Sequence, residues 1–306
     1  MRKTCLEMVY KLAKEDPRIV FIGSDLGFGA LSEFKTEMPD RFFMEGVYEA
    51  NLAGMAAGLA LEGKIVYFNT IATFITRRCF EQVALDLCLH NVNVRLIGNG
   101  GGMVYAPLGP THEAIEDIAI MRAIPNMTIV APADADEMRR VMPLTVDHAG
   151  PLYIRLGKGY DPIVTTDEIP FEIGRGLPVR HGKDALIVTT GITLKLSLAA
   201  AENLKTKGID VGILHLPTVK PLDTDRLLEM AAPVKAIVSV EEHTIIGGLG
   251  SAVAEILFEA NFNETKKFKR IGIPDVFPDG YGSQNSLMER YGITSDAIIS
   301  TIKNFF

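Results

Sequence analysis

Glu49 is the first residue of this chain whose type and position suggest chemistry. It precedes a run of small residues, Ala53–Ala60, which favours a helix packed closely against its neighbours. A carboxyl group that loses hydration at such a helix start binds a proton more readily, which suits a group that shares a proton with a ligand. The structural alternative is a first-turn acid that interacts favourably with the helix dipole.

A second group of candidates follows the strand expected at 64–69. Ligands of open α/β sheets bind at the carboxyl ends of the strands. Phe74 could therefore stack on a flat heterocycle, with Arg77 and Arg78 close behind it in the sequence. The alternative is that Phe74 and Phe80 are ordinary core residues.

Two further candidates lie beyond the next strands. Gly100–Gly102 lets the backbone approach a ligand or turn with positive φ. Pro110 and Thr111 are expected to start a helix whose first turn carries His112, where an imidazole could transfer a proton or bind a substrate hydroxyl. The alternative is a surface histidine. Arg155 ends a buried strand and could hold an anionic group, or it could pair with a nearby acid.

A glycine-containing loop at 241–253 resembles a dinucleotide-binding fingerprint, because its glycines lie between a strand and a helix. It lacks the third glycine of that motif, and several residues separate it from the strand. We therefore interpret it as a packing loop and not as a nicotinamide site.

Composition excludes several classes of function. The net charge of −7 and the scattered distribution of the 31 basic residues argue against nucleic-acid binding. Cys5, Cys79 and Cys88 show neither metal-ligand spacing nor an even count for disulfides, so we assign no metal ligands and expect a reducing cytoplasm. The sequence contains no run of about 18 apolar residues, which is the length that a membrane span needs.

The chain alternates short β-branched runs with helical patterns, which predicts parallel strand–helix–strand units. We expect two doubly wound α/β domains at 1–160 and 183–306, joined by a linker at 161–182. Asp134 and Glu137 are expected to cap one helix. The expected strands are 19–23, 64–69, 94–98, 127–131, 152–156, 185–190, 211–214, 236–240 and 269–273, and the expected helices are 49–61, 80–89, 112–122, 134–147, 194–205, 224–230, 251–259 and 295–303.

Several segments together resemble a known enzyme family over essentially the whole chain. The chain resembles the C-terminal two-thirds of transketolase and of 1-deoxyxylulose-5-phosphate synthase, and more distantly the β subunits of 2-oxo acid dehydrogenases. The segments that carry the resemblance are GVYEANLAGMAAGLA, TFITRRCFEQVALD, GPTHEAIEDIAIMRAIPNMTIVAPAD and EEHTIIGGLGSAVAE.

This resemblance implies a pyrimidine-binding domain for thiamine diphosphate followed by a transketolase C-terminal-like domain. It implies that Glu49 bonds to N1′ of the aminopyrimidine and that Phe74 stacks on that ring. His112 would face the reacting end of the donor sugar, and Arg155 would hold a sugar phosphate. Asp25 falls where the family lines the cofactor pocket.

The chain departs from the family pattern at the donor pocket. Leu108 stands where transketolases carry an acid, and glycines stand where they carry an upstream histidine. We therefore expect a substrate other than the ordinary pentose phosphates, such as a branched, modified or unphosphorylated sugar. Arg77 and Arg78 both remain candidates for the substrate-side arginine of the synthase, because the segment differs in length by one residue.

The chain also lacks the Gly-Asp-Gly motif through which the family binds the diphosphate and its metal; the nearest string is Pro278–Gly282, in the other domain. The resemblance therefore implies a split enzyme in which an N-terminal partner subunit holds Mg²⁺ (or Ca²⁺). We expect an α₂β₂ heterotetramer built on a homodimer of this chain.

The expected activity is transfer of a two-carbon ketol unit from a ketose to an aldose. One alternative is a subunit like deoxyxylulose-phosphate synthase or a 2-oxo acid decarboxylase, which would release CO₂. Another, of a different class, is a non-catalytic partner subunit.

Overall fold

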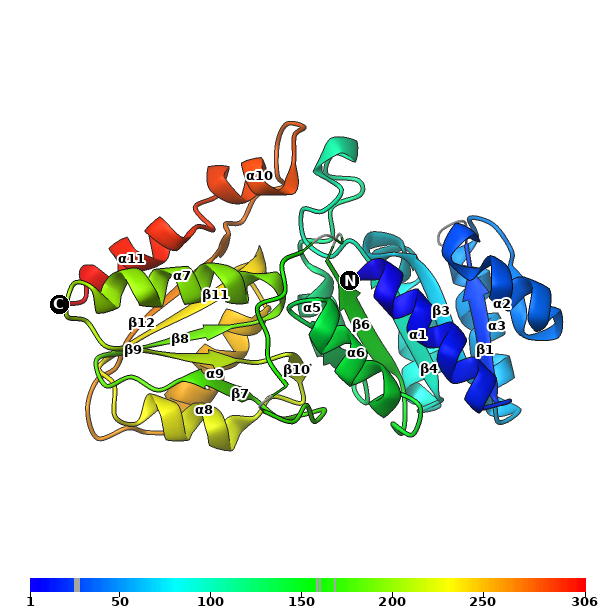
Figure 1. Ribbon diagram of the computed structural model, residues 1–306, viewed down its shortest axis with the longest axis horizontal. Helices are drawn as coiled ribbons and strands as arrows, with labels where there is room; N and C mark the ends of the chain where they lie inside the picture. The colour runs from blue at the N-terminus through cyan, green and yellow to red at the C-terminus, as the bar shows by residue number, and fades with distance from the viewer. Residues whose placement is uncertain (25–27, 158, 160, 168) are drawn as a thin grey trace.

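The computed structural model describes residues 1–24, 28–157, 159, 161–167 and 169–306. Two α/β domains lie side by side along the long axis of the molecule, each built on its own sheet (Figure 1). The sheets are dominated by parallel pairs, as the alternating pattern predicted. Asp25 lies outside the described residues, so its predicted place in a cofactor pocket stays a prediction.

Within the described residues, the first sheet has the strand order β10-β5-β6-β4-β3-β1-β2, and all its neighbours except β10 and β5 run parallel. The central strands are apolar and buried almost throughout, as expected for parallel strands covered on both faces. The strands are β1 (Ile19–Gly23), β2 (Phe42–Met44), β3 (Ile65–Ile71), β4 (Val94–Asn99), β5 (Thr128–Val130), β6 (Leu152–Leu156) and β10 (Thr218–Lys220).

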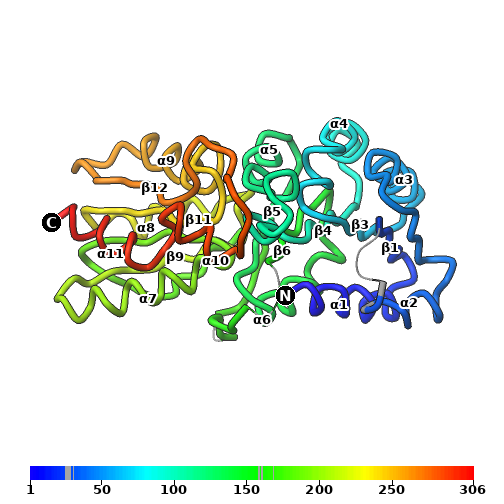
Figure 2. The backbone as a smooth tube through the Cα atoms, turned by 90° about the horizontal axis from the view of Figure 1, so that it is seen from above, coloured from blue at the N-terminus to red at the C-terminus, as the bar shows by residue number. Residues whose placement is uncertain are grey.

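Helices cover both faces of this sheet, with α1, α2 and α6 on one side and α3, α4 and α5 on the other (Figure 2). In the described ranges no helix is long and apolar enough to cross a bilayer. The helices are α1 (Arg2–Glu15), α2 (Ser32–Glu37), α3 (Glu49–Leu61), α4 (Phe80–Gln82), α5 (Asp117–Ala123) and α6 (Ala135–Leu144), with short 3₁₀ or π turns η1 (Phe28–Leu31), η2 (Pro39–Arg41), η3 (Phe74–Arg78), η4 (Val83–Leu89) and η5 (Ala106–Leu108).

One predicted helix begins later than expected. The pattern placed its start at His112, but α5 begins at Asp117, so His112 lies in a loop. Ala114 exchanges two backbone hydrogen bonds with Gly102, at 2.8 and 2.9 Å. These bonds occupy the amide and carbonyl of Ala114, which therefore cannot join a helical ladder.

The predicted cap of α6 is confirmed, since Asp134 accepts hydrogen bonds from the amides of Asp136 and Glu137.

The second sheet has the order β12-β11-β8-β9-β7. Its edge strand β7 lies inside the segment predicted as a linker and pairs antiparallel with β9, so that segment is partly ordered sheet. The elements are β7 (Leu177–Arg180), β8 (Ala185–Thr189), β9 (Val211–His215), β11 (Ala236–Thr244), β12 (Lys267–Ile273), η6 (Gly191–Thr193), α7 (Leu194–Lys205), α8 (Thr224–Ala231), α9 (Leu249–Glu259), α10 (Gln284–Arg290) and α11 (Ser295–Lys303).

The two domains share a strand and a hydrophobic core. Strand β10 belongs by sequence to the second domain but pairs antiparallel with β5 at the edge of the first sheet. A single apolar cluster continues from Phe68 and Ile118 to Leu214 and Leu249 in the second domain. This continuity fixes the relative position of the two domains.

Arg95, on β4, is a fully buried cation that holds the segment between α6 and β6, residues 145–151, in place through hydrogen bonds. Its guanidinium donates hydrogen bonds to the carbonyl oxygens of Thr145 and Gly150, each at 2.6 Å, and to that of His148. Burial lowers the pKa of Arg95 to about 10, so the side chain stays charged at neutral pH. Removal of the guanidinium would leave the carbonyl oxygens of two buried residues, Thr145 and Gly150, without their donor.

We predict that Arg95→Met lowers the free energy of unfolding by about 3 kcal/mol or more, because several buried acceptors lose their donor. Urea unfolding measures the loss. Arg18→Met is the matched control, because Arg18 is exposed and pairs with Asp16 at 2.6 Å, so its loss should stay below about 1 kcal/mol. Similar small losses in both variants would contradict the prediction.

Candidate active site

Glu49 is buried at the first position of α3, with 1% of its surface exposed. One carboxylate oxygen accepts a hydrogen bond from the guanidinium of Arg78 at 2.7 Å. The other accepts a longer one, 3.3 Å, from the hydroxyl of Thr70 at the end of β3. The structure therefore places this carboxyl group in the dehydrated position that the sequence predicted, and a cation faces it.

Phe74, Arg77 and Arg78 belong to a π-helical turn, Phe74–Arg78, directly after β3. A π turn contains one more residue than an α turn, and such turns often occur at functional sites. The guanidinium carbon of Arg78 lies 3.8 Å from the centroid of the Phe74 ring, in a cation–π contact. Arg77 points elsewhere, and its Nε lies 2.9 Å from the carboxylate of Glu116.

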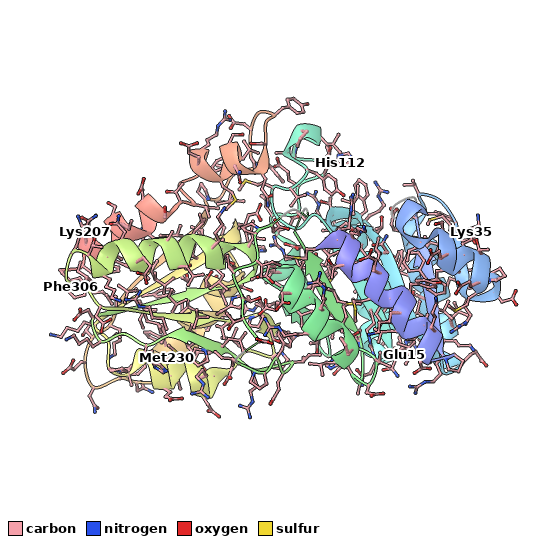
Figure 3. All side chains as sticks on the ribbon, in the orientation of Figure 1. Glu15, Lys35, His112, Lys207, Met230 and Phe306 are labelled. Carbon is pink, nitrogen blue, oxygen red and sulfur yellow. The ribbon has the colours of Figure 1, made fainter. Side chains whose placement is uncertain are left out.

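His112 also contacts Phe74. Its ring meets that of Phe74 edge to face, with centroids 5.2 Å apart, and its Nδ1 lies 2.9 Å from the hydroxyl of Thr111. Figure 3 shows His112 near the loop that projects from the first domain. Arg77 ties this loop down through the carbonyl oxygens of Thr111 and Glu113, at 3.5 and 3.3 Å. Glu49 and Phe74 both contact Arg78, and Phe74 contacts His112, so the three side chains are linked through Arg78.

Arg155, by contrast, is occupied by the protein itself. Its Nε lies 2.7 Å from Asp117, and a terminal nitrogen donates to the carbonyl oxygens of Ala114 and Glu242. Burial alone would lower the pKa of Arg155, but the charge and hydrogen bond of Asp117, together with the nearby Glu242 and Tyr153, raise it. These contacts favour the structural alternative, pairing with a nearby acid. The predicted role in binding a sugar phosphate stays a prediction.

The glycine turn Gly100–Gly102 is explained by packing. Gly102 has φ +70°, and a Cβ on it would lie 2.4 Å from the carboxyl carbon of Glu242. A Cβ on Gly101 would lie 2.6 Å from the Arg155 side chain. Glu242 in turn accepts hydrogen bonds from the Met103 amide at 2.8 Å and from Gln284 at 2.9 Å. Close approach of protein groups therefore requires these glycines.

The loop at 241–253 packs as predicted. Glu241 accepts hydrogen bonds from the amides of Leu249 and Gly250, at 2.7 and 2.8 Å, at the N-terminus of α9. In a dinucleotide site that position would bind a phosphate, so here a carboxylate of the chain itself takes its place.

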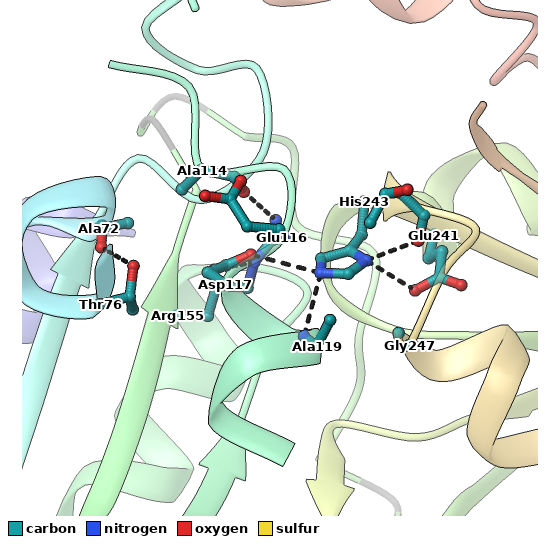
Figure 4. Close-up of polar contacts among 12 residues, drawn as sticks. Ala72, Thr76, Ala114, Glu116, Asp117, Ala119, Arg155, Glu241, His243 and Gly247 are labelled. Carbon is teal, nitrogen blue, oxygen red and sulfur yellow. Dashed lines mark hydrogen bonds and ion pairs between the residues drawn. The ribbon is translucent and has the colours of Figure 1, made fainter. Parts of the chain in front are cut away.

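The buried ring of His243 lies between Asp117 and Glu241 and joins the two domains (Figure 4). Its Nδ1 donates to the carbonyl oxygen of Thr244 at 2.7 Å, and its Nε2 accepts from the Ala119 amide at 3.2 Å. This pattern requires a neutral imidazole protonated on Nδ1. His243 is therefore a connector between α5 and β11.

Comparison with known proteins agrees with this architecture. The family description "Transketolase, pyrimidine binding domain" matches residues 1–160, and "Transketolase, C-terminal domain" matches residues 174–298. The chain belongs to the transketolase family. The resemblance inferred from the sequence motifs is thereby confirmed.

Three proteins that are similar to this transketolase-family chain over most of its length show which kinds of transketolase it resembles. A solved split gene transketolase, described as an inactive beta4 tetramer, matches with a TM-score of 0.90 and 37% identity over 99% of this chain and 97% of that one. A 6-deoxy-6-sulfo-D-fructose transketolase subunit of Clostridium sp. is 36% identical over 98% of this chain and 92% of its own. An apulose-4-phosphate transketolase subunit of Actinobacillus succinogenes is 38% identical over 88% of this chain and 86% of its own.

Three buried acids of this transketolase-family chain were missed by the sequence reasoning: Glu113, Asp117 and Glu242. A signal existed for Glu242, because two adjacent acids end an apolar strand. Glu113 follows His112 directly, and neither of its oxygens has a hydrogen-bond partner among the described residues. Burial raises the pKa of Glu113 to about 7. Its carboxyl group therefore changes charge near neutral pH, next to the candidate site.

We predict that Glu113→Gln stabilises the protein at about pH 8 by about 1 to 2 kcal/mol and has little effect near pH 5. In the folded protein the pKa of the Glu113 carboxyl group is about 7, above its ordinary value of 4.5. The group therefore keeps its proton until the pH approaches this raised pKa. The contribution of Glu113 to the free energy of unfolding is therefore fully present below the ordinary pKa of the carboxyl group. It is lost as the pH rises through the pKa of the folded state.

Urea unfolding of the variant and the wild type at both pH values measures this difference. The pKa of Glu242 is also raised to about 7 by burial, but Glu242 is present in both proteins and cancels in the comparison. An effect of Glu113→Gln that did not change with pH would contradict the prediction.

Proposed function

We propose that this chain is the pyrimidine-binding subunit of a split transketolase that transfers a two-carbon ketol unit from a ketose to an aldose. The observation that carries the proposal is that Glu49 is buried at the start of α3 in a transketolase-family fold. Arg78 links Glu49 to Phe74, and Phe74 contacts His112. A non-catalytic subunit would have no need of a buried carboxyl group linked in this way to an aromatic ring and a histidine.

The residues present fit thiamine diphosphate. Glu49 is a buried carboxyl group whose short contact is to Arg78, a side chain that is 44% exposed. Phe74 offers an aromatic face that the same side chain covers. A carboxyl group for N1′ and a flat ring for stacking are the two elements that an aminopyrimidine requires. When bound, the cofactor would supply an electron sink for cleavage of the ketose carbon–carbon bond.

The chain's own residues would act on protons and on orientation. Glu49 holds or releases a proton at N1′, where its burial keeps water from competing. Phe74 sets the plane of the ring, and Asp25 is proposed to line the same pocket. His112, in edge contact with Phe74, is placed to hold a proton at a hydroxyl or carbonyl oxygen of the donor.

We further propose that a partner subunit carries the diphosphate and its Mg²⁺ or Ca²⁺ in an α₂β₂ heterotetramer, built on a homodimer of this chain. The sequence has no Gly-Asp-Gly. Relatives similar over most of their length are named as subunits, and one solved homotetramer is described as inactive. A cytoplasmic enzyme of sugar metabolism fits these features.

We propose that the substrate is a sugar other than the ordinary pentose phosphates. A cavity of about 220 Å³ lies at the loop after β4, and Arg2, Val104, Tyr105, Pro107 and the half-exposed Leu108 line it together with two glycines. Leu108 contributes an apolar side chain to this cavity where the resemblance led us to expect an acid. Two relatives are named for sugars other than xylulose 5-phosphate.

The decisive experiment is Glu49→Ala in the complex reconstituted with its partner subunit. We expect turnover to fall at least about 100-fold, because the proton-sharing group at N1′ is lost. Ketol transfer is measured with coupled assays. Glu62→Ala, at the exposed far end of α3, is the matched control and should keep its activity. Unchanged turnover in the Glu49 variant would refute the function proposed.

We also predict that the reconstituted enzyme prefers a modified or branched ketose over xylulose 5-phosphate by about tenfold or more in kcat/KM, because the pocket offers an apolar residue at position 108. Leu108→Asp should shift the preference toward xylulose 5-phosphate. Equal turnover of every sugar tried would argue against this. Release of CO₂ from pyruvate would instead assign the decarboxylating alternative.

A further inference from the structure

Arg78 fills the subsite that the proposed function gives to the aminopyrimidine. Its guanidinium donates to Glu49 Oε2 at 2.7 Å, and at the same time the guanidinium carbon lies over the Phe74 ring, 3.8 Å from the ring centroid. A guanidinium is planar, carries N–H donors in its plane and stacks on aromatic rings. Arg78 thus makes the same two kinds of contact, one with each residue, that the aminopyrimidine would make.

We propose that Arg78 is a built-in competitor of the aminopyrimidine, which must leave Glu49 and Phe74 before the cofactor can bind. The inference rests on the proposed function and adds a gating residue to it. The two occupants exclude each other, because Glu49 is 1% exposed and both of its carboxylate oxygens already accept hydrogen bonds, one of them from Arg78.

Arg78 has a route out of the subsite. Its side chain is 44% exposed, and among the described residues its guanidinium makes its polar contact with Glu49. Arg77 is unsuited to this role, because its contacts with Glu116 and with the carbonyl oxygens of the His112 loop hold it away. The π turn therefore separates two adjacent arginines into one that positions a loop and one that can move.

Removal of the Arg78 side chain should favour the cofactor, because the competing occupant of the Glu49 carboxylate and of the Phe74 face is then gone. If the occupied form makes up about nine-tenths of the free chain, the apparent affinity should rise about tenfold.

The test measures thiamine binding to the isolated chain by titration calorimetry, with thiamine as the probe because it presents the aminopyrimidine without the diphosphate. Arg78→Met is expected to bind thiamine about tenfold more tightly than the wild type. Arg78→Lys keeps a positive charge beside Glu49 but lacks the planar guanidinium that covers Phe74, so it should tighten thiamine binding less than Arg78→Met does. Arg139→Met, at an exposed arginine of α6, controls for the change in net charge and should not tighten binding.

Unchanged or weaker thiamine binding by Arg78→Met, or no detectable binding by any of these proteins, would overturn the inference. Arg78→Gln provides a second variant if Arg78→Met does not fold, and it should also tighten binding, because it removes the guanidinium that covers Phe74. Binding of Mg²⁺–thiamine diphosphate by the reconstituted wild-type complex tests the proposed function separately. Binding there without tightening in the variants would refute the gating role alone.

Discussion

The buried ion pair between Arg155 and Asp117 connects three segments that are distant in the sequence. The arginine extends from β6, the aspartate starts α5, and the remaining donors of the guanidinium reach the carbonyl oxygens of Ala114 and Glu242. A charged pair away from water requires close and well-directed partners. The loop that carries His112 and the strand end that carries Glu242 are therefore both held against Arg155. This fixes the position of the backbone next to the candidate site.

Much of this arrangement follows from the sequence. Buried parallel strands have an apolar pattern that is easy to recognise, so β1, β4 and β6 lie within a residue of their expected bounds. Glu49, Phe74 and His112 lie together because each begins or follows a connection at the same edge of the sheet. The sequence could not show β7 and β10, because these strands are short and their pairing depends on distant partners.

Side-chain partners were harder to predict than positions. Arg155 stands at the expected strand end, yet its guanidinium is taken up by Asp117, and only the folded chain reveals that the acid is within 2.7 Å. The two adjacent arginines show the same limit. Adjacent residues of any helical turn point in different directions, so the sequence could not show which of Arg77 and Arg78 faces Glu49, and no sequence pattern announces the π turn that carries them. Contacts of this kind depend on the local backbone rather than on residue type.

Strand β10 has a consequence for how such a chain can be divided. It comes after the linker region and yet completes the edge of the first sheet, next to β5. A gene broken between the two domains would leave β5 with unpaired backbone groups and would expose the apolar cluster that both domains share. The two domains therefore depend on each other for a paired sheet edge and for cover of their shared apolar cluster, and a break between them would cost the chain both.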